Sequence, residues 1–234
     1  MSLARWVGLF LLVMTAVVTA QVPLSKEPRH RVTFENAQVR ILDVKVPPGD
    51  TSLDHLHDRD IVTVSMTSGT DTRLQSPGQP WGPVRPPRPL GDAVVAEYTG
   101  KASSHRIENV GKSAYQLFAL ENLRTNGWAT SPALSAPATK LTAESRAFRI
   151  YDVRLGRDGS QTSHTHAVPT IALLIGGKLM SEGPDTQAKA NAPAPVGLKQ
   201  LDQPGQWVLI PPGDTHHLVR LGVGDARLVE IEVR

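Results

Sequence analysis

The residues of this chain that could do chemistry are mainly its histidines. Seven of the eight fall into two sets, each with a His-x-His pair and a later histidine position. The candidate ligands are His55, His57 and His105 in the first half, and His164, His166 and His216 in the second. Alternate residues of a strand point to one face, so each pair presents two imidazoles together. Converging imidazoles bind divalent transition metals, and the sequence therefore predicts two metal sites.

A longer repeat contains these histidines. Residues 40–45 (RILDVK) recur as residues 149–154 (RIYDVR), a shift of 109 that also relates the two His-x-His pairs. The same shift places Glu121 on Glu230. Because one shift aligns a strand-like run, a histidine pair and a closing strand, we expect an internal duplication. The eighth histidine, His30, has no counterpart in the repeat.

Residues 1–20 have the layout of a secretory signal peptide. Arg5 precedes an apolar run that ends in small residues at Ala20. The run is shorter than the roughly 20 apolar residues of a membrane-spanning helix. We expect an exported protein, periplasmic or secreted, and an uncleaved membrane anchor is the alternative.

The duplication divides the rest of the chain into two domains. We expect a first domain at 21–124, a linker at 125–143 that is rich in Ala, Ser, Thr and Pro, and a second domain at 144–234. Residues 21–30 are expected to form a loose lead-in. Short apolar runs are broken by Pro, Gly, Asn and Asp, and helical periodicity is absent, which indicates an all-β fold.

A proline-rich segment, residues 76–91, interrupts the strand pattern of the first domain. It contains six prolines and Trp81. Proline cannot donate to a strand ladder, so we expect an insertion between strands that runs over the surface. Recognition of this segment by a partner is an alternative, and so is capping of the barrel mouth by Trp81.

Composition excludes several classes of function. The chain has 25 Lys and Arg against 22 Asp and Glu, without a basic run, so we expect no nucleic-acid partner. The absence of cysteine excludes disulfides and thiolate ligands, which leaves imidazole and carboxylate for any metal. No segment after the signal peptide is apolar enough to span a bilayer, so no membrane partner is expected after cleavage. We expect a small-molecule substrate or ligand, and a homodimer is left open.

Two motifs resemble those of the cupin superfamily. Residues 49–57 resemble its first motif, G-x5-H-x-H, and residues 205–216 resemble its second, G-x5-P-x-G-x2-H. The second motif of the first copy is looser, with Glu97 in the place of proline. The resemblance covers residues 32–124 and 144–234. It implies two tandem double-stranded β-helix barrels of the cupin or jelly-roll type, a bicupin.

The resemblance also implies a ligand from which this chain departs. Cupin metal sites usually add a glutamate three or four residues after the His-x-His pair. Those places hold Ile61, Val62, Thr170 and Ile171. We therefore expect two three-histidine sites without a protein anion. Glu121 and Glu230, like Asp43 and Asp152, are expected to be salt-bridged or exposed strand residues.

Two adjacent histidines compete for one ligand position in the second copy. Neighbouring strand residues face opposite ways, so only one of His216 and His217 can reach the metal. The motif spacing favours His216, and we expect His217 on the surface or supporting a ligand.

The expected function follows from the ligand set. Within the cupins, three histidines resemble the dioxygenases that act on cysteine or diketones, and they speak against oxalate oxidases and decarboxylases. We expect an exported metal-dependent bicupin, a small-molecule enzyme of the three-histidine dioxygenase type that uses Fe, Mn, Ni or Zn. No catalytic acid or base is assigned. The alternative is a non-catalytic periplasmic cupin that binds a small ligand or a metal ion.

Overall fold

The computed structural model describes residues 21–124, 131–156, 159–182 and 199–234. The expected signal peptide lies outside the described residues. Within them, regular structure consists of strands apart from a short 3-10 helix, η1 (Leu24–Lys26). The expectation of an all-β fold is thus confirmed. Within the same residues, no helix has the length and apolar character of a membrane span.

The first barrel is built from two sheets that face each other. Its strands are β1 (Val22–Pro23), β2 (His30–Glu35), β3 (Val39–Val46), β4 (His55–His57), β5 (Ile61–Ser65), β6 (Thr72–Gln75), β7 (Ala93–Ala96), β8 (Ser103–Asn109) and β9 (Tyr115–Asn122). One sheet has the order β2-β3-β9-β5-β7 and the other β1-β4-β8-β6. The histidine pair lies on β4, and His105 lies on its neighbour β8.

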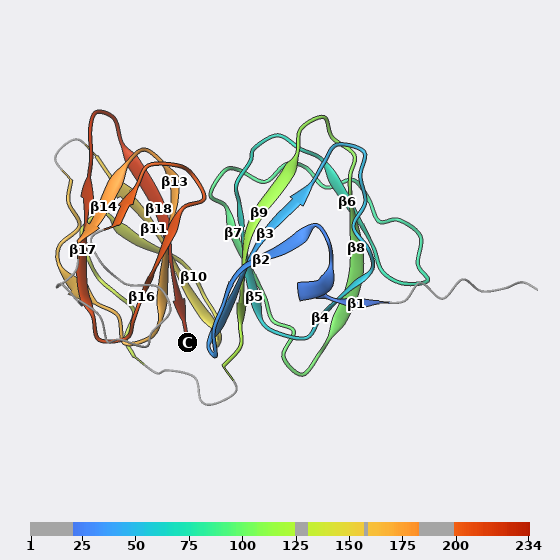
Figure 1. Ribbon diagram of the computed structural model, residues 1–234, viewed down its shortest axis with the longest axis horizontal. Coiled ribbons are helices and arrows are strands. Elements are labelled where there is room, and N and C mark those ends of the chain that lie inside the picture. Colours follow the sequence, from blue (N-terminus) through green and yellow to red (C-terminus); the bar gives the residue numbers. More distant parts are fainter. Residues whose placement is uncertain (1–20, 125–130, 157–158, 183–198) are drawn as a thin grey trace, which may run out of the picture.

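The second barrel repeats this topology. Its strands are β10 (Thr139–Glu144), β11 (Phe148–Leu155), β12 (His164–Thr165), β13 (Thr170–Gly176), β14 (Leu179–Glu182), β15 (Lys199–Leu201), β16 (Trp207–Ile210), β17 (Thr215–Arg220) and β18 (Ala226–Val233). Its sheets have the orders β10-β11-β18-β13-β16 and β12-β17-β14-β15. Figure 1 shows the two barrels side by side. The duplication inferred from the sequence is therefore a duplication of the fold.

Two segments are more ordered than the sequence suggested. In the expected lead-in, β1 pairs in parallel with β4, and Leu24 is buried. In the expected linker, β10 pairs with β11, so the second barrel begins by Thr139. Both β2 and β10 lie at a sheet edge and are mostly exposed. Such strands lack the apolar alternation by which a strand is recognised in a sequence.

The five-stranded sheets of the two barrels share one hydrophobic core. It contains Val39, Ile41, Val62, Val64, Phe118 and Leu120 from the first barrel, and Phe148, Ile150, Ile171, Leu173, Val229, Ile231 and Val233 from the second. Alternate residues of the same strands, such as Leu42 and Val44 of β3, face the barrel interior. These strands are apolar on both faces because one face closes the barrel and the other joins it to its twin.

Candidate metal sites

The first cluster consists of His55, His57 and His105, whose ligand atoms lie within 4.8 Å of one another. The pairing of β4 with β8 sets His55 opposite His105. The ring centroids are 4.7 Å apart for His55 and His105, 4.8 Å for His57 and His105, and 5.0 Å for His55 and His57. The three residues predicted from the first half of the sequence therefore meet in one place.

The nitrogens of this cluster fit a metal ion. His55 Nδ1 lies 2.9 Å from the carbonyl oxygen of Leu53 and donates to it, so Nε2 keeps its lone pair. Both ring nitrogens of His57 are buried without a hydrogen-bond partner. A buried polar atom without a partner costs free energy, and coordination of an ion by that atom would remove the cost.

Burial also keeps these imidazoles neutral, the state that binds metals. Desolvation, with help from neighbouring histidines, lowers the pKa of His57 to about 2 and that of His105 to about 3. The pKa of His55 is lowered to about 4, again chiefly by burial.

The second cluster has a fourth member that the sequence analysis did not assign. His164, His166, His216 and Glu230 bring their ligand atoms within 4.8 Å of one another. Glu230 Oε1 lies 3.4 Å from His216 Nε2 and 3.9 Å from His164 Nε2. The expectation of three histidines without a protein anion fits the first cluster but is wrong for the second. Glu230 is fully buried among the histidines, and is neither exposed nor paired with Arg or Lys among the described residues.

The strand register explains why this carboxylate was missed. Glu230 of β18 lies opposite Tyr151 of β11, whereas Ala119 of β9 lies opposite Leu42 of β3. Leu42 and Tyr151 are equivalent at the shift of 109. The residue equivalent to Glu230 in the first barrel is therefore Ala119, and the closing strands are related by a shift of 111.

Glu121 thus corresponds to Glu232, not to Glu230. In the first barrel Glu121 makes a 2.6 Å ion pair with Arg40, as expected. In the second, Glu232 Oε1 accepts a 2.8 Å hydrogen bond from His166 Nδ1. This carboxylate fixes the ring so that Nε2 of His166 faces the cluster. A clue was present in the sequence, because His105 and His216 are also related by a shift of 111.

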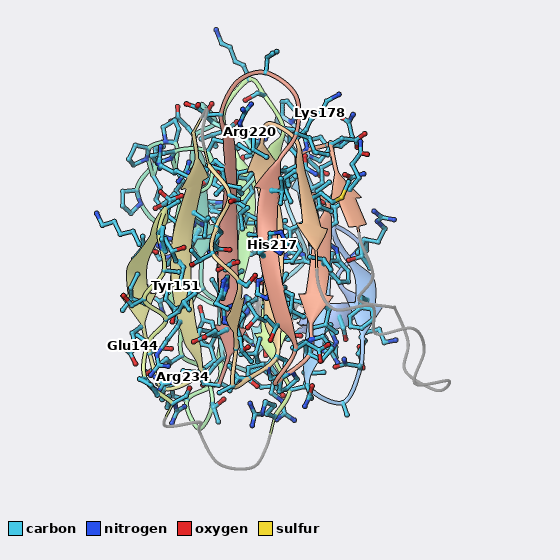
Figure 2. The ribbon with its side chains drawn as sticks, turned by 90° about the vertical axis from the view of Figure 1, so that its left-hand side faces the viewer. Glu144, Tyr151, Lys178, His217, Arg220 and Arg234 are labelled. Carbon is cyan, nitrogen blue, oxygen red and sulfur yellow. The ribbon has the colours of Figure 1, made fainter. Side chains whose placement is uncertain are left out.

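The remaining predictions for single residues can be compared with the structure. His216 is buried and belongs to the cluster, whereas His217 is half-buried. Figure 2 looks onto this barrel and labels His217 on β17. Of the two histidines, His216 is the one that joins the cluster, and its role as a metal ligand stays a prediction. Asp43 and Asp152 are ion-paired as expected, with Arg31 at 3.2 Å and with Arg227 at 2.7 Å.

A cavity of about 410 Å³ lies beside the first cluster, and the three histidines line it. This volume is typical of sites for small ligands. Its apolar walls include Val44, Ile61, Leu74, Ile107 and Leu117. Its polar lining includes His30, Arg85, Arg88 and Tyr98, and no Asp or Glu is present among the described residues that line it.

The proline-rich segment supplies part of the cavity wall. Arg85, Pro86 and Arg88 line the cavity, so this segment is more than an insertion over the surface. Trp81 lies under two guanidinium groups, with Arg73 at 4.8 Å and Arg106 at 5.0 Å from its ring centroid. Among the described residues, those of the segment that line the cavity are Arg85, Pro86 and Arg88, and Trp81 is not one of them.

His30, the histidine outside the repeat, also lines the cavity. Its ring centroid is 4.5 Å from that of His55, and its Nδ1 lies 2.5 Å from Glu27 Oε2. Although burial alone would raise the pKa of Glu27, hydrogen bonds from His30 and from the backbone lower it to about 2. The equivalent of His30 in the second barrel is Thr139, since each lies opposite an equivalent valine of the next strand. The first barrel thus has a buried Glu27–His30 pair beside its cluster.

Comparison with known proteins supports the fold. No protein-family model and no curated protein matches the sequence. Among solved structures, AerE from Microcystis aeruginosa has a TM-score of 0.58 at 16% identity, covering 89% of this chain and 98% of that one. Salicylate 1,2-dioxygenase from Pseudaminobacter salicylatoxidans has a TM-score of 0.60 at 9% identity, covering 88% and 77%.

A third structure carries the family's name. The cupin 2 conserved barrel domain protein from Leptotrichia buccalis has a TM-score of 0.52 at 7% identity, covering 87% of this chain and 88% of that one. Identities this low are evidence for the fold and leave the activity open. The histidine motifs, the paired jelly-roll barrels and these neighbours agree, and the chain has the cupin fold in its two-barrel, bicupin form.

Proposed function

We propose that the first barrel is the catalytic centre of a metal-dependent enzyme that acts on a small molecule, with chemistry of the dioxygenase type. The observation that carries this proposal is the three-histidine cluster beside a cavity of about 410 Å³. The cluster lies beside a space large enough for a small ligand. Ala119 stands at the position that Glu230 occupies in the second barrel, so the first cluster has no carboxylate there.

His55, His57 and His105 would hold the ion. A redox-active divalent metal such as iron, manganese or nickel would supply activation of dioxygen and of a chelating substrate oxygen. Because the three imidazoles are neutral, they leave the full charge of the ion to act on its remaining ligands. The apolar walls of the cavity, including Ile61 and Leu117, would orient the carbon skeleton and exclude water.

One of the structural neighbours supports this type of chemistry. The structure with a TM-score of 0.60 is a salicylate 1,2-dioxygenase, so the two-barrel fold is compatible with dioxygenase activity. The likeness is one of fold, and the assignment to this chain rests on the cluster and its cavity.

The second barrel would have a supporting role. Glu230 places a negative charge beside three histidines, and the side chains of the cluster are at most 8% exposed. A zinc ion held by all four of these side chains would have the complete tetrahedral set of a structural zinc site, whereas catalytic zinc sites keep one position open. Because Glu230 is present, a missing glutamate does not speak against oxalate-type chemistry in this barrel.

The competing proposal is a non-catalytic cupin that captures a small ligand or a metal ion. In the second barrel, the buried cluster of four possible ligands favours this non-catalytic proposal. Export to the periplasm or the medium stays a prediction from residues 1–20, and the partner of either function remains a small molecule.

Metal content and oxygen uptake test the proposal together. The purified chain is reconstituted with iron, manganese, nickel or zinc, and oxygen uptake is followed across catechols, hydroxybenzoates, diketones, flavonols and thiols. We expect uptake with a redox-active metal, its loss in His57→Ala, and its retention in His166→Ala. Metal binding without uptake for any compound would favour the non-catalytic proposal. Uptake that survives His57→Ala would place the chemistry elsewhere.

A further inference from the structure

The two arginines that the proline-rich segment brings to the cavity differ in their bonding. Arg88 Nε donates to Asp92 Oδ2 at 2.8 Å, and Nη1 donates to Thr63 Oγ1 at 3.0 Å. Its Nη2 donates to the carbonyl oxygens of Thr63 and Asp92 at 2.9 and 2.7 Å. The guanidinium of Arg88 is therefore used to fasten the segment to β5, and little of it is left for a ligand.

Arg85 has a fixed backbone, whereas its side chain has no partner within the part of the chain that the structure describes. Its amide donates to the carbonyl of Thr72 at 2.7 Å, and its carbonyl accepts from the amide of Thr72 at 3.3 Å. Among the described residues, no carboxylate and no hydrogen-bond acceptor is assigned to its guanidinium. The side chain is exposed yet lines the cavity, which places a free cation at its edge.

The charge of Arg85 extends to the cluster. Burial is the main cause of the lowered pKa of His105, and the positive charge of Arg85 adds to it. The same charge acts on Tyr98 and Tyr115, two further residues of the lining. Arg85 and the three histidines line the same cavity of about 410 Å³, so one small ligand can meet both.

The described lining of the cavity has no negative charge to balance that of Arg85. Its described lining contains no Asp or Glu, and Ala119 stands where the second barrel has Glu230. A divalent ion on three neutral imidazoles would add two further positive charges. An anionic ligand would neutralise this excess, and a carboxylate matches the planar fork of a guanidinium with two parallel hydrogen bonds.

We infer that the cavity of the first barrel selects small carboxylates, and that Arg85 is the residue that binds the carboxylate group. This inference rests on the proposed function only for the location of the site. The apolar body of the ligand would lie against Val44, Leu74 and Ile107, with the carboxylate at the edge formed by the proline-rich segment.

Calorimetric titration of the zinc-loaded chain tests the inference without turnover, because zinc is redox-inert. The probes are salicylate and its neutral amide, salicylamide, which share a ring and a hydroxyl. The variants are Arg85→Gln, Arg85→Lys and the control Arg31→Gln. Arg31→Gln removes the same charge from the same barrel. The Arg31 side chain is 73% exposed and is not among the residues that line the cavity.

We expect wild type to bind salicylate more tightly than salicylamide. Arg85→Gln should weaken salicylate binding by about tenfold or more, the effect of one charge-assisted pair, and leave salicylamide binding unchanged. Arg85→Lys should fall between, and Arg31→Gln should equal wild type. Salicylate affinity within twofold of wild type in Arg85→Gln would overturn the inference, as would equal affinity for the two probes or no binding of either.

Zinc content, measured on the same variants made in a His166→Ala background that disables the second cluster, separates this result from the fate of the proposed function. Carboxylate selectivity that depends on Arg85 in protein without zinc at the first cluster would refute the metal centre and keep the inference. A zinc-loaded first cluster with no effect of Arg85→Gln would refute the inference alone.

Discussion

Replacement of Glu230 by Gln would show whether the second cluster is a four-ligand metal site. The change preserves side-chain shape and removes the charge that lies 3.4 Å from His216 Nε2 and 3.9 Å from His164 Nε2. It is made in a His57→Ala background, so that zinc acts through the second barrel. Loss of a charged direct ligand should weaken zinc binding by about 100-fold or more, since even outer partners of metal ligands contribute about 10- to 100-fold.

The thermal consequence can be calculated by linkage. Free zinc at about 100 times the dissociation constant stabilises the folded state by roughly 2.7 kcal/mol. For a chain of this size that is about 5–10 °C in melting temperature. After a 100-fold loss of affinity, the same zinc concentration contributes only about 0.4 kcal/mol, or about 1–2 °C.

The assay is a differential melting curve with zinc or with a chelator, followed by circular dichroism or calorimetry. Glu35→Gln in the same background is the control, because it removes a carboxylate 47% exposed on the first barrel. It should keep the whole zinc-dependent shift. If Glu230→Gln also keeps that shift, Glu230 is no metal ligand and its burial among the histidines needs another explanation.

Three further predictions follow from the same geometry. The first uses Ala119→Glu in a chain whose second cluster is disabled by His166→Ala. Zinc binding at the first cluster should become about tenfold tighter or more, because a charged ligand joins three neutral ones. Equilibrium dialysis measures the affinity, and an unchanged value would contradict the equivalence of residues 119 and 230. His216→Ala should halve the zinc content of the chain and His217→Ala should leave it intact, as judged by elemental analysis. Glu27→Gln should destabilise the metal-free chain by up to about 3 kcal/mol at pH 7, from the fall of the pKa from 4.5 to about 2. Because the pKa of Glu27 is lower in the folded state, this stabilisation is complete above pH 4.5 and is lost as the pH falls towards 2. Urea unfolding across that range should show a shrinking difference in the free energy of unfolding between wild type and Glu27→Gln. A constant difference would contradict the prediction.

The two barrels have diverged around a shared frame. Each keeps a His-x-His pair that begins on a short strand, β4 or β12, and a third histidine on the neighbouring strand. Around this frame the first barrel has a cavity, the Glu27–His30 pair and arginines from the proline-rich segment. The second has Glu230 in the cluster and Glu232 behind His166. The proposed division of roles, with a catalytic first barrel and a supporting second barrel, rests on these differences.

Duplication, fold class and the six histidines could be predicted from the sequence because each depends on local order. A spacing of two puts residues on one face of a strand, so the His-x-His pairs needed no tertiary information. The turn signals and short apolar runs likewise predicted the β-strands. The exposed edge strand β10 was assigned to the linker for most of its length, because it has too few apolar residues to show a period.

What the tertiary structure decided was which residues far apart in the chain meet. The equivalence of residues 119 and 230 follows only from their pairing with β3 and β11. Because the closing strands are related by a shift of 111 and not 109, the residue equivalent to Glu230 is Ala119 and not Glu121. Arg85 and His30 line the cavity but belong to segments outside the repeated motifs, so the repeat gave no sign of them. Strand periodicity is a property of neighbours in sequence, whereas the ligand set and the charge of a cavity depend on register between distant strands, which is settled only when the sheets close.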